Sequence, residues 1–339
     1  MTMDWRTYLD AIENEIQRIV ADHAADVAPL YDMMAYHLGW LDESFHPVPA
    51  SRGKRLRPLI CALSCEAAGG DWHRALPAAA SLELVHNFSL IHDDIEDNSA
   101  TRRGRRTVWS RWGPAHGINT GDAMLSLARR AMALLMERGV DSSTTLTAML
   151  RLDAILAQLC EGQYLDISGE GQLELSEAWY MRMIGGKTAA LLAGSAELGA
   201  LVAQAHDRLN HFRDFGWYLG LAFQMVDDIL GIWGDPANTG KSAASDIESR
   251  KMTLPVIVAM RSGDEGERLA SLYRQAHLNP QDVQNAMAIL EHAGARHYVQ
   301  QMAITYERQA LEALMLSGAT DPAAEHLRSL TAALTSRRT

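Results

Sequence analysis

Residues 83–97 read Glu-Leu-Val-His-Asn-Phe-Ser-Leu-Ile-His-Asp-Asp-Ile-Glu-Asp, and this stretch decides the fold that we predict. Its apolar positions have the three-and-four spacing of a buried helix: Leu84, Val85, Phe88 and Ile91. Asp93 and Asp97 lie four residues apart, so their carboxylates share one helix face, and Asp94 flanks them. Like charges at this spacing repel each other and weaken a helix unless a cation lies between them. The stretch therefore predicts a buried helix whose acidic end binds a cation.

Four arginines follow this helix after the polar break Asn98-Ser99: Arg102, Arg103, Arg105 and Arg106. Magnesium prefers hard oxygen ligands, usually takes one or two protein carboxylates, and fills its other positions with water and phosphate oxygens. Arginine pairs bidentately with phosphate. Acids followed by arginines therefore indicate a diphosphate held through magnesium. A bare DDxxD also occurs at solvated acidic helix ends, so the rest of the chain must decide between the two.

Helical periodicity dominates the 339 residues and alternating strand patterns are scarce, which predicts an all-α protein. The length allows two domains or one large helical domain, and we predict a single domain over residues 1–339. A hydrophobic share of 47% is enough for a sizeable core.

No run reaches the roughly 18 uncharged apolar residues of a membrane span, and the N-terminus lacks the apolar segment of a signal peptide. We expect a cytoplasmic protein without stable membrane insertion. A net charge of −11 argues against nucleic acid as a partner. Cys61, Cys65 and Cys160 are few and dispersed, which indicates buried reduced thiols.

A second basic motif, Gly53-Lys54-Arg55-Leu56-Arg57-Pro58, precedes a helix that we expect to run to about Ala68. Lys54 and Arg57 lie near the start of this helix, where backbone amides also favour anions. They form either a second phosphate grip or a basic helix flank.

A second apolar helix, predicted over Phe215–Ile232, contains Phe223-Gln224-Met225-Val226-Asp227-Asp228. It repeats the arrangement of the first stretch, an apolar helix that ends in paired aspartates. Two such helices facing each other could hold several magnesium ions. Gly185-Gly186-Lys187-Thr188 superficially resembles a nucleotide-binding loop, but it lacks the first glycine and a preceding strand, so we reject that interpretation.

Other predicted elements are helices over residues 4–24, 27–43, 121–139 and 144–166, and a polar loop over 234–253 with Lys241 and Lys251. Ser176 is expected to cap a helix, and Asn279-Pro280 to start one.

Five motifs in order resemble those of the trans-polyprenyl diphosphate synthases: Gly53 to Pro58, Leu90 to Asp97 with Arg102-Arg103-Gly104, Lys187-Thr188, Phe223 to Asp228, and Gly240-Lys241 with Lys251 to Pro255. The resemblance implies an isoprenoid synthase helical bundle around a central active-site cavity, about three Mg²⁺ ions and usually a homodimer. It also implies transfer of a prenyl group from an allylic diphosphate (dimethylallyl, geranyl or farnesyl) to isopentenyl diphosphate.

Carried onto this chain, the resemblance makes Asp93, Asp97 and Asp227 the magnesium ligands and adds Asp94 and Asp228 as their catalytic neighbours. The allylic diphosphate would be held by Arg102, Lys187, Thr188, Gln224 and Lys241, and Lys251 is also placed among the substrate-binding residues. Isopentenyl diphosphate would be bound by Lys54, Arg57, His86 and Arg103. Without its place in the motif, His86 would be taken for a core histidine.

Product length in this family depends on the cavity floor beneath the first aspartate helix. Phe88 lies five residues before Asp93, about 7.5 Å along the axis, and Ser89 beside it is small. This combination resembles the C20-forming pattern, so we predict geranylgeranyl diphosphate, with C15 and C25 as the nearest alternatives. A core role for Phe88 is compatible with its being the floor.

Two positions depart from the family pattern. Gly231 stands where the second motif usually ends in aspartate, and Arg106 replaces a common proline, which we interpret as loop variation. A terpene cyclase of the same fold, weakly favoured by Gly231, would need no isopentenyl diphosphate site. A non-catalytic partner subunit would be expected to lack the first aspartates, which this chain keeps.

Overall fold

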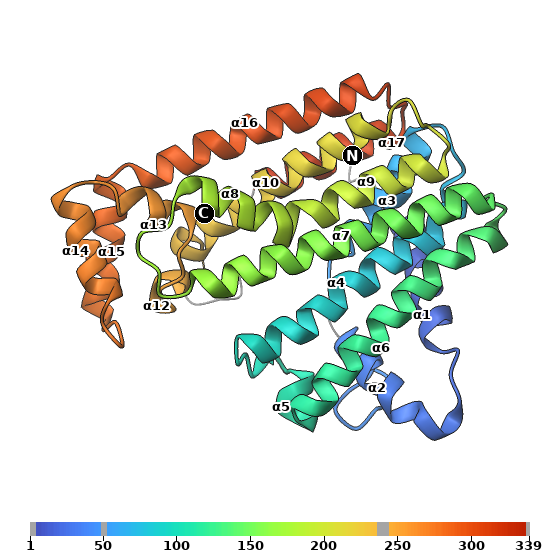
Figure 1. The fold of residues 1–339 in the computed structure, drawn as a ribbon, viewed down its shortest axis with the longest axis horizontal. Helices are drawn as coiled ribbons and strands as arrows, with labels where there is room; N and C mark the ends of the chain where they lie inside the picture. Colours follow the sequence, from blue (N-terminus) through green and yellow to red (C-terminus); the bar gives the residue numbers. More distant parts are fainter. Residues whose placement is uncertain (1–4, 49–52, 236–243, 337–339) are drawn as a thin grey trace. The chain divides into compact units, whose positions relative to one another are not determined.

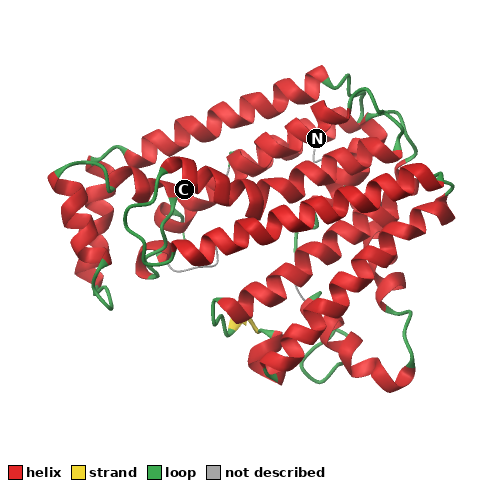
Figure 2. Cartoon of the chain, viewed as in Figure 1, coloured by secondary structure: helices red, strands yellow, loops and turns green. Residues whose placement is uncertain are grey.

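The structure is a computed structural model that describes residues 5–48, 53–235 and 244–336 (Figure 1). Helices make up most of the described chain (Figure 2). Its strands are two residues each, β1 (Thr101–Arg102) and β2 (Arg105–Arg106), and they form an antiparallel pair. The all-α prediction is confirmed.

The chain divides into two compact units. The first unit contains Met1–Ala154, Gly194–Asn210 and Gly318–His326, and the second contains Ile155–Ala193, His211–Ser317 and Leu327–Thr339. Several helices continue from one unit into the other, so neither unit is one continuous segment. The expectation of a single domain over 1–339 stays a prediction.

The first unit is built around α4, the helix of the first aspartate motif. Its elements are α1 (Arg6–Val20), η1 (Ala25–Val27), α2 (Ala28–His37), α3 (Leu56–Ala67), η2 (Trp72–Ala75), α4 (Leu76–Glu96), α5 (Val108–Trp112), α6 (Pro114–Ala133), η3 (Leu134–Arg138) and the start of α7 (Ser142–Gly169). Helix α4 packs chiefly against α6, and also against α3 and α1. Glycine permits the closest approach, because a Cβ atom at Gly121 of α6 would lie 2.2 Å from Nε2 of His92. The aspartates of α4 are therefore carried on a firmly packed helix.

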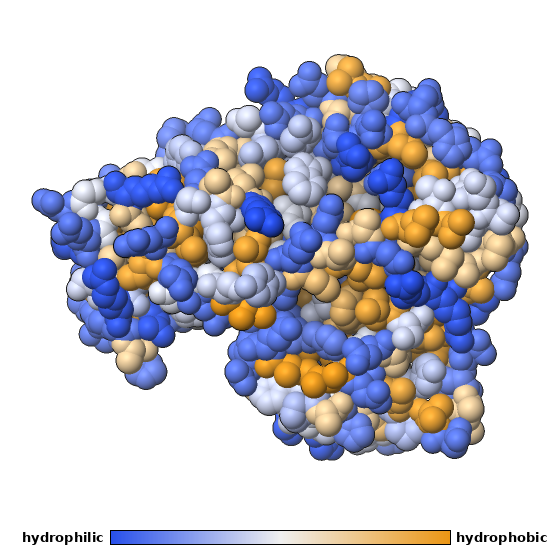
Figure 3. Space-filling view, in the orientation of Figure 1, coloured by the Kyte–Doolittle hydropathy of each residue, from blue (hydrophilic) through white to orange (hydrophobic). Residues whose placement is uncertain are grey.

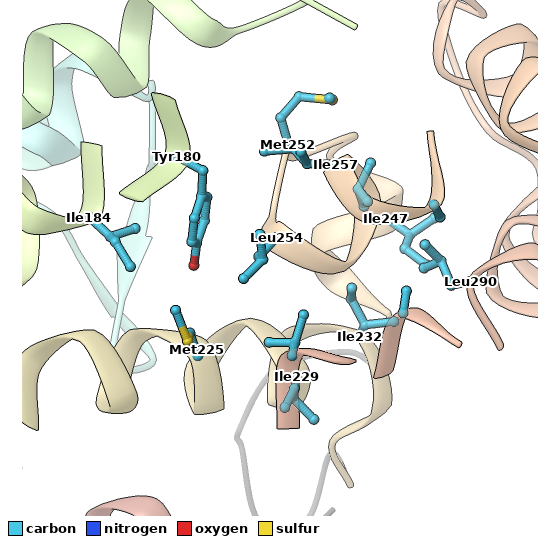
Figure 4. Close-up of a cluster of buried hydrophobic side chains, with 14 of the residues drawn as sticks. Tyr180, Ile184, Met225, Ile229, Ile232, Ile247, Met252, Leu254, Ile257 and Leu290 are labelled. Atoms are coloured by element: carbon cyan, nitrogen blue, oxygen red, sulfur yellow. The ribbon is translucent and has the colours of Figure 1, made fainter. Parts of the chain in front are cut away.

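The second unit carries the second aspartate motif on α10. Its elements are α8 (Glu177–Ile184), the π-helical segment η4 (Gly185–Ala189), most of α10 (Leu209–Trp233), α12 (Ser245–Glu248), α13 (Leu254–Ala259), α14 (Asp264–Tyr273), α15 (Pro280–His292) and α16 (Ala295–Leu316). Helices α9 (Ala190–Val202) and α17 (Ala323–Thr335) are shared between the units. One apolar cluster joins α8, α10, α12, α13 and α15, and Figure 4 shows Tyr180 in it, with its hydroxyl directed toward α10.

Several predicted boundaries are wrong. The helix expected over 27–43 ends at His37, because the chain turns at Gly39 (φ 87°) and Leu41 bridges to Pro47. The helix expected from residue 121 starts at Pro114, since proline is well tolerated in a first helical turn. The region 234–253 is not loop throughout, because it contains α12.

Other expectations from the sequence have mixed outcomes. Ser176 accepts a hydrogen bond from the amide of Trp179, and Asn279 forms a capping box with Asp282, which confirms both helix starts. Cys61 and Cys65 are buried thiols, whereas Cys160 of α7 is exposed, contrary to expectation. A search of the described residues finds no helix with the length and apolar character needed to cross a bilayer.

Candidate active site

A β-hairpin positions the first two arginines of the basic cluster. Arg103 (φ 52°) and Gly104 (φ 73°) form its two-residue turn, and Arg102 pairs with Arg105 across the strands. Positive φ at both turn residues is typical of a type I′ turn, whose twist suits a tight hairpin. The segment expected as a loop is thus a short hairpin that follows α4.

Arg102 binds the first aspartate pair directly. Its Nη2 lies 3.0 Å from Oδ2 of Asp93, and its Nε lies 2.8 Å from Oδ1 of Asp94. The Asp94 side chain is 2% exposed and that of Asp93 is 18% exposed. Burial raises the pKa of Asp94 to about 6, against the opposing effect of Arg102. Arg102 therefore offsets the repulsion among these carboxylates, while Asp93 and the exposed Asp97 remain one helical turn apart.

Two of the residues expected to bind isopentenyl diphosphate, Arg57 and Arg103, lie near a third, His86. Burial lowers the pKa of His86 well below its usual value, and Arg57 and Arg103 lower it further. The guanidinium of Arg103 also lies against the backbone of Gly53, where a Cβ atom would be 2.8 Å from Nη2. Lys54 follows Gly53 directly and is exposed. His86 is therefore a neutral side chain among cationic ones.

The other two arginines of the cluster have a structural role. Arg105 donates to the carbonyl oxygens of Tyr36 (3.0 Å) and Leu41 (2.6 Å), and its guanidinium lies 4.1 Å from the ring centroid of Tyr36. Arg106 donates to the carbonyl oxygen of Ser110. Both side chains hold the hairpin to its neighbours.

In the second unit, most of the residues expected to bind substrate line one small pocket. Its lining includes Lys187, Thr188, Gln224, Asp228 and Lys251. Lys241 lies outside the described residues.

A hydrogen-bond chain fixes the buried side of this pocket. Thr188 Oγ1 lies 2.8 Å from Gln224 Oε1, and Gln224 Nε2 lies 3.0 Å from Asp228 Oδ1. Oδ2 of Asp228 accepts from the hydroxyl of Tyr180 (2.6 Å) and from the amide of Leu254 (3.2 Å). Burial raises the pKa of Asp228 to about 6. Asp228 therefore joins α8, α10 and α13, while Asp227 is less buried.

Lys187 lies on a π-helical segment that crosses α7 at close range. Its ammonium group forms an ion pair with Asp166 of α7. A Cβ atom at Gly162 would lie 2.0 Å from the amide nitrogen of Lys187, so the two backbones touch. Short π-helical segments often occur at functional sites, because the extra residue re-aims side chains. The glycine contact and the ion pair together fix the direction of Lys187.

The structure also gives a physical reason for Gly231. A Cβ atom at this position would lie 2.0 Å from Oδ2 of Asp246, which belongs to α12. Asp227 and residue 231 are one helical turn apart, the same spacing as Asp93 and Asp97. The carboxylate of Asp246 therefore lies at the place where the side chain of an aspartate at 231 would begin.

The aspartates suit a magnesium ion that also binds phosphate. No group of three histidine, cysteine or acidic side chains in the described ranges is arranged to hold a metal by itself. Magnesium is commonly bound through one or two carboxylates plus water and phosphate oxygens. Asp93 with Asp97, and Asp227 with the nearby Asp246, supply hard oxygen ligands of this kind.

The two residues expected to set product length face different directions on α4. Ser89 lies four residues before Asp93 and so shares its face, and its hydroxyl donates to the carbonyl oxygen of His86 (2.8 Å). Phe88 is 6% exposed and packs edge-on against His92, with 5.5 Å between ring centroids.

Three residues around the pocket of the second unit were not predicted from the sequence: Asp166, Tyr180 and Asp246. Each lies in a segment remote from the motif that it contacts, so no spacing along the chain could indicate the contact.

Residues 39–290 match the family model described as polyprenyl synthetase, which is well over half of the chain. This chain belongs to the polyprenyl synthetase family. The geranylgeranyl diphosphate synthase of Mycobacterium tuberculosis is 44% identical over 84% of this chain and 81% of its own length. The (2E,6E)-farnesyl diphosphate synthase of the same species is 41% identical over 86% of this chain and 82% of its own. The family resemblance and the transferase class are thereby confirmed.

Solved structures agree with this assignment. A polyprenyl synthetase from Streptomyces coelicolor has a TM-score of 0.90 and 34% identity, covering 97% of both chains. A polyprenyl synthase from Caulobacter crescentus, solved with calcium and isoprenyl diphosphate, has a TM-score of 0.80 and 30% identity, covering 98% of this chain and 95% of its own.

Proposed function

We propose that this polyprenyl synthetase condenses isopentenyl diphosphate head to tail with an allylic diphosphate and makes mainly geranylgeranyl diphosphate (C20). The grouping of Arg57 and Arg103 around the neutral His86 supports this most directly, because elongation needs a second diphosphate site. The name of the 44% identical relative supports the C20 product, and that of the farnesyl relative supports C15 as the alternative.

The allylic diphosphate is bound through magnesium and cationic side chains. Asp93, Asp97 and Asp227 are the proposed magnesium ligands, for about three ions. When bound, magnesium supplies positive charge that stabilises the departing diphosphate. Arg102 and Lys187 bind its oxygens from the protein side, and their carboxylate partners keep these cations in position until the substrate arrives.

The remaining substrate contacts follow from the pocket of the second unit and from the sequence motifs. Thr188, Gln224, Lys241 and Lys251 complete the binding of the allylic diphosphate. Lys54, Arg57 and Arg103 bind the diphosphate of isopentenyl diphosphate by charge, and neutral His86 adds a hydrogen bond.

The reaction begins when the allylic C–O bond breaks, which releases diphosphate and leaves an allylic carbocation. The double bond of isopentenyl diphosphate attacks this cation, and a proton then leaves the new chain. The released diphosphate accepts that proton, since no histidine or glutamate in the motifs is a clear base. The apolar helix faces around the prenyl chain exclude water, which would otherwise capture the cation.

The enzyme acts in the cytoplasm as a homodimer. The face drawn in Figure 3 shows apolar side chains in separate groups among hydrophilic ones. Leu146 and Leu150 of α7 are 58% and 61% exposed in the single chain, which supports burial against a second copy.

The test is a magnesium-dependent assay with labelled isopentenyl diphosphate and dimethylallyl, geranyl or farnesyl diphosphate, followed by chromatography of the dephosphorylated products. A linear C20 alcohol, formed only when isopentenyl diphosphate is present, is the expected result. A main product of C15 or C25 would correct the chain length alone. A cyclic hydrocarbon formed from the allylic diphosphate alone would overturn elongation in favour of a terpene cyclase.

A further inference from the structure

Arg55 lies between two residues that we assign to isopentenyl diphosphate, yet its own side chain points into the protein. The side chain is 4% exposed. Its Nε lies 3.0 Å from Oε2 of Glu13, and its Nη1 lies 2.8 Å from Oε1 of Glu83. A weaker contact of 3.4 Å joins Nη2 to the carbonyl oxygen of Leu38. Arg55 is therefore a buried, fully engaged cation and does not bind substrate.

The backbone at Arg55 has a conformation that arginine rarely adopts. Its φ of 47° and ψ of 40° lie in the left-handed region, immediately before α3 begins at Leu56. Such a residue persists only where its surroundings over-determine it. The ion pairs of Arg55 provide that constraint, and they set the course of the chain between Lys54 and the first turn of α3, which contains Arg57.

Glu83 connects this buried arginine with another part of the same site. Its Oε1 also accepts a hydrogen bond of 2.9 Å from Asn87, which orients the carboxylate from within α4. Burial lowers the pKa of Arg103; the negative charge of Glu83 opposes this shift, whereas the positive charge of Arg55 adds to it. Glu83 therefore forms an ion pair with Arg55 and also acts on the charge of Arg103 through its electric field.

Glu13 is also held by the surrounding structure. The indole nitrogen of Trp40 donates to its Oε1, so α1, the segment after α2, α3 and α4 all meet at Arg55. Each of these elements belongs to the first unit.

We propose that the buried Glu13–Arg55–Glu83 network is the positioning element of the isopentenyl diphosphate site. The network aligns Lys54, Arg57 and Arg103 so that their charges meet one diphosphate. This inference rests on the proposed function. Its signature is selective, because Arg102 and the residues of the second unit bind the other substrate without help from Arg55.

The test uses Glu83→Gln, which keeps the size and an acceptor oxygen but removes the charge. We expect KM for isopentenyl diphosphate to rise about tenfold or more, while KM for the allylic diphosphate and kcat stay within about twofold. Arg55→Met should give the same selective loss, and Arg55→Lys, which retains the charge, should recover part of it. Calorimetric titration with isopentenyl diphosphate alone gives a second readout that needs no turnover.

Glu197→Gln is the matched control, because Glu197 is another buried glutamate of the first unit, 3.4 Å from Arg151. It should leave both KM values unchanged. If Glu83→Gln raises both KM values equally, or changes only thermal stability, the network is merely structural and the inference is wrong. If the wild-type protein consumes no isopentenyl diphosphate, the proposed function itself fails, which is a separate outcome. If Arg55→Met does not fold, the KM values of Glu83→Gln and Arg55→Lys still test whether the network positions the isopentenyl diphosphate site.

Discussion

In each aspartate pair, the first carboxylate is accessible and the second is built into the framework. Arg102 is bound to both Asp93 and Asp94, but Asp93 is 18% exposed and Asp94 only 2%. Asp227 is likewise more exposed than Asp228, which is 3% exposed and accepts three hydrogen bonds. The repeated aspartate motif therefore combines an aspartate that is available to a metal ion with one that stabilises the fold. Substitutions at these adjacent residues should separate the two effects.

We predict that Asp228→Ala chiefly lowers stability, whereas Asp227→Ala chiefly lowers activity. Loss of Asp228 leaves the hydroxyl of Tyr180 and the amide of Leu254 without their acceptor, which should lower the free energy of unfolding by about 1–3 kcal/mol. Loss of Asp227 should change stability little but lower magnesium-dependent kcat/KM by more than about 100-fold. Urea denaturation and the prenyl transfer assay measure the two effects. Equal stability losses in both variants would contradict this division of roles.

Phe88 and Ser89 should change product length in opposite directions. Phe88→Ala removes the proposed floor and should lengthen the main product beyond C20. Ser89 lies on the same helix face as Asp93, one turn before it. Ser89→Phe adds a ring there, above the level of Phe88, and should shorten the product to C15. Chromatography of the dephosphorylated alcohols gives the answer. An unchanged product length in Phe88→Ala would show that this side chain is core and not floor.

His37 should make the protein less stable in acid. Burial, and then the charges of Arg102 and Arg103, lower its pKa to about 3. An unfolded chain takes up the proton near pH 6.5, whereas the folded protein does not until about pH 3. The stability contribution is therefore complete above pH 6.5 and is lost as pH falls, by up to about 1.4 kcal/mol per pH unit.

Substitution of His37 by Gln should reduce this slope between pH 6 and pH 4. Urea denaturation of the protein without metal or substrate, at steps of half a pH unit, measures it. His277→Gln, a change at an exposed histidine, serves as the control and should keep the wild-type slope. A slope that is the same in wild type and His37→Gln would contradict the assignment.

Among the helices, α12 places a carboxylate beside the position of α10 at which the second motif lacks one. Gly231 leaves room on α10, and α12 brings the carboxylate of Asp246 into that room. Asp246 also contributes to the raised pKa of Asp228, which agrees with a position near the aspartate pair. A carboxylate can therefore be supplied there by either helix, but not by both.

This arrangement predicts a rescue by exchange. Asp246→Asn should weaken binding of Mn²⁺, measured by electron paramagnetic resonance with inorganic diphosphate present, by about tenfold or more. Gly231→Asp alone should destabilise the protein, because the new side chain meets Asp246. The double variant Gly231→Asp with Asp246→Gly should regain most of the Mn²⁺ affinity. Glu248→Gln, at an exposed acid of α12, should bind Mn²⁺ like the wild type. Wild-type affinity in Asp246→Asn would contradict the prediction.

Local signals in the sequence predicted the helices well, but not the contacts between remote segments. Proline and capping signals indicated the start of α15, and apolar spacing indicated α4 and α10. The β-hairpin was missed because its strands are too short for an alternating pattern, although Arg103-Gly104 carries turn chemistry. Arg55 stood inside a recognised motif, yet its partners lie 42 and 28 residues away. Tertiary packing alone creates such pairs.

For the molecule as a whole, the positive charge around His86 is opposite in sign to the net charge of the chain. The chain carries a net charge of −11, whereas Arg57, Arg102 and Arg103 share one neighbourhood around His86. A cationic site on an acidic protein attracts small diphosphates by its local field, while the surrounding surface repels large polyanions. This contrast suits an enzyme whose substrates are small diphosphates.

An exposed apolar face on α7 is the proposed contact between two copies of the chain. Leu146 and Leu150 lie four residues apart on α7 and so form one apolar face, 58% and 61% exposed. If this face is buried between two copies, Leu150→Glu places a charge in the interface and should shift the protein to monomer. Sedimentation velocity at micromolar concentration measures the mass. Leu316→Glu, at a leucine of α16 with 57% exposure, is the matched control and should keep the dimer. A dimer that persists in Leu150→Glu would place the interface elsewhere, and a monomeric wild-type protein would contradict the homodimer itself.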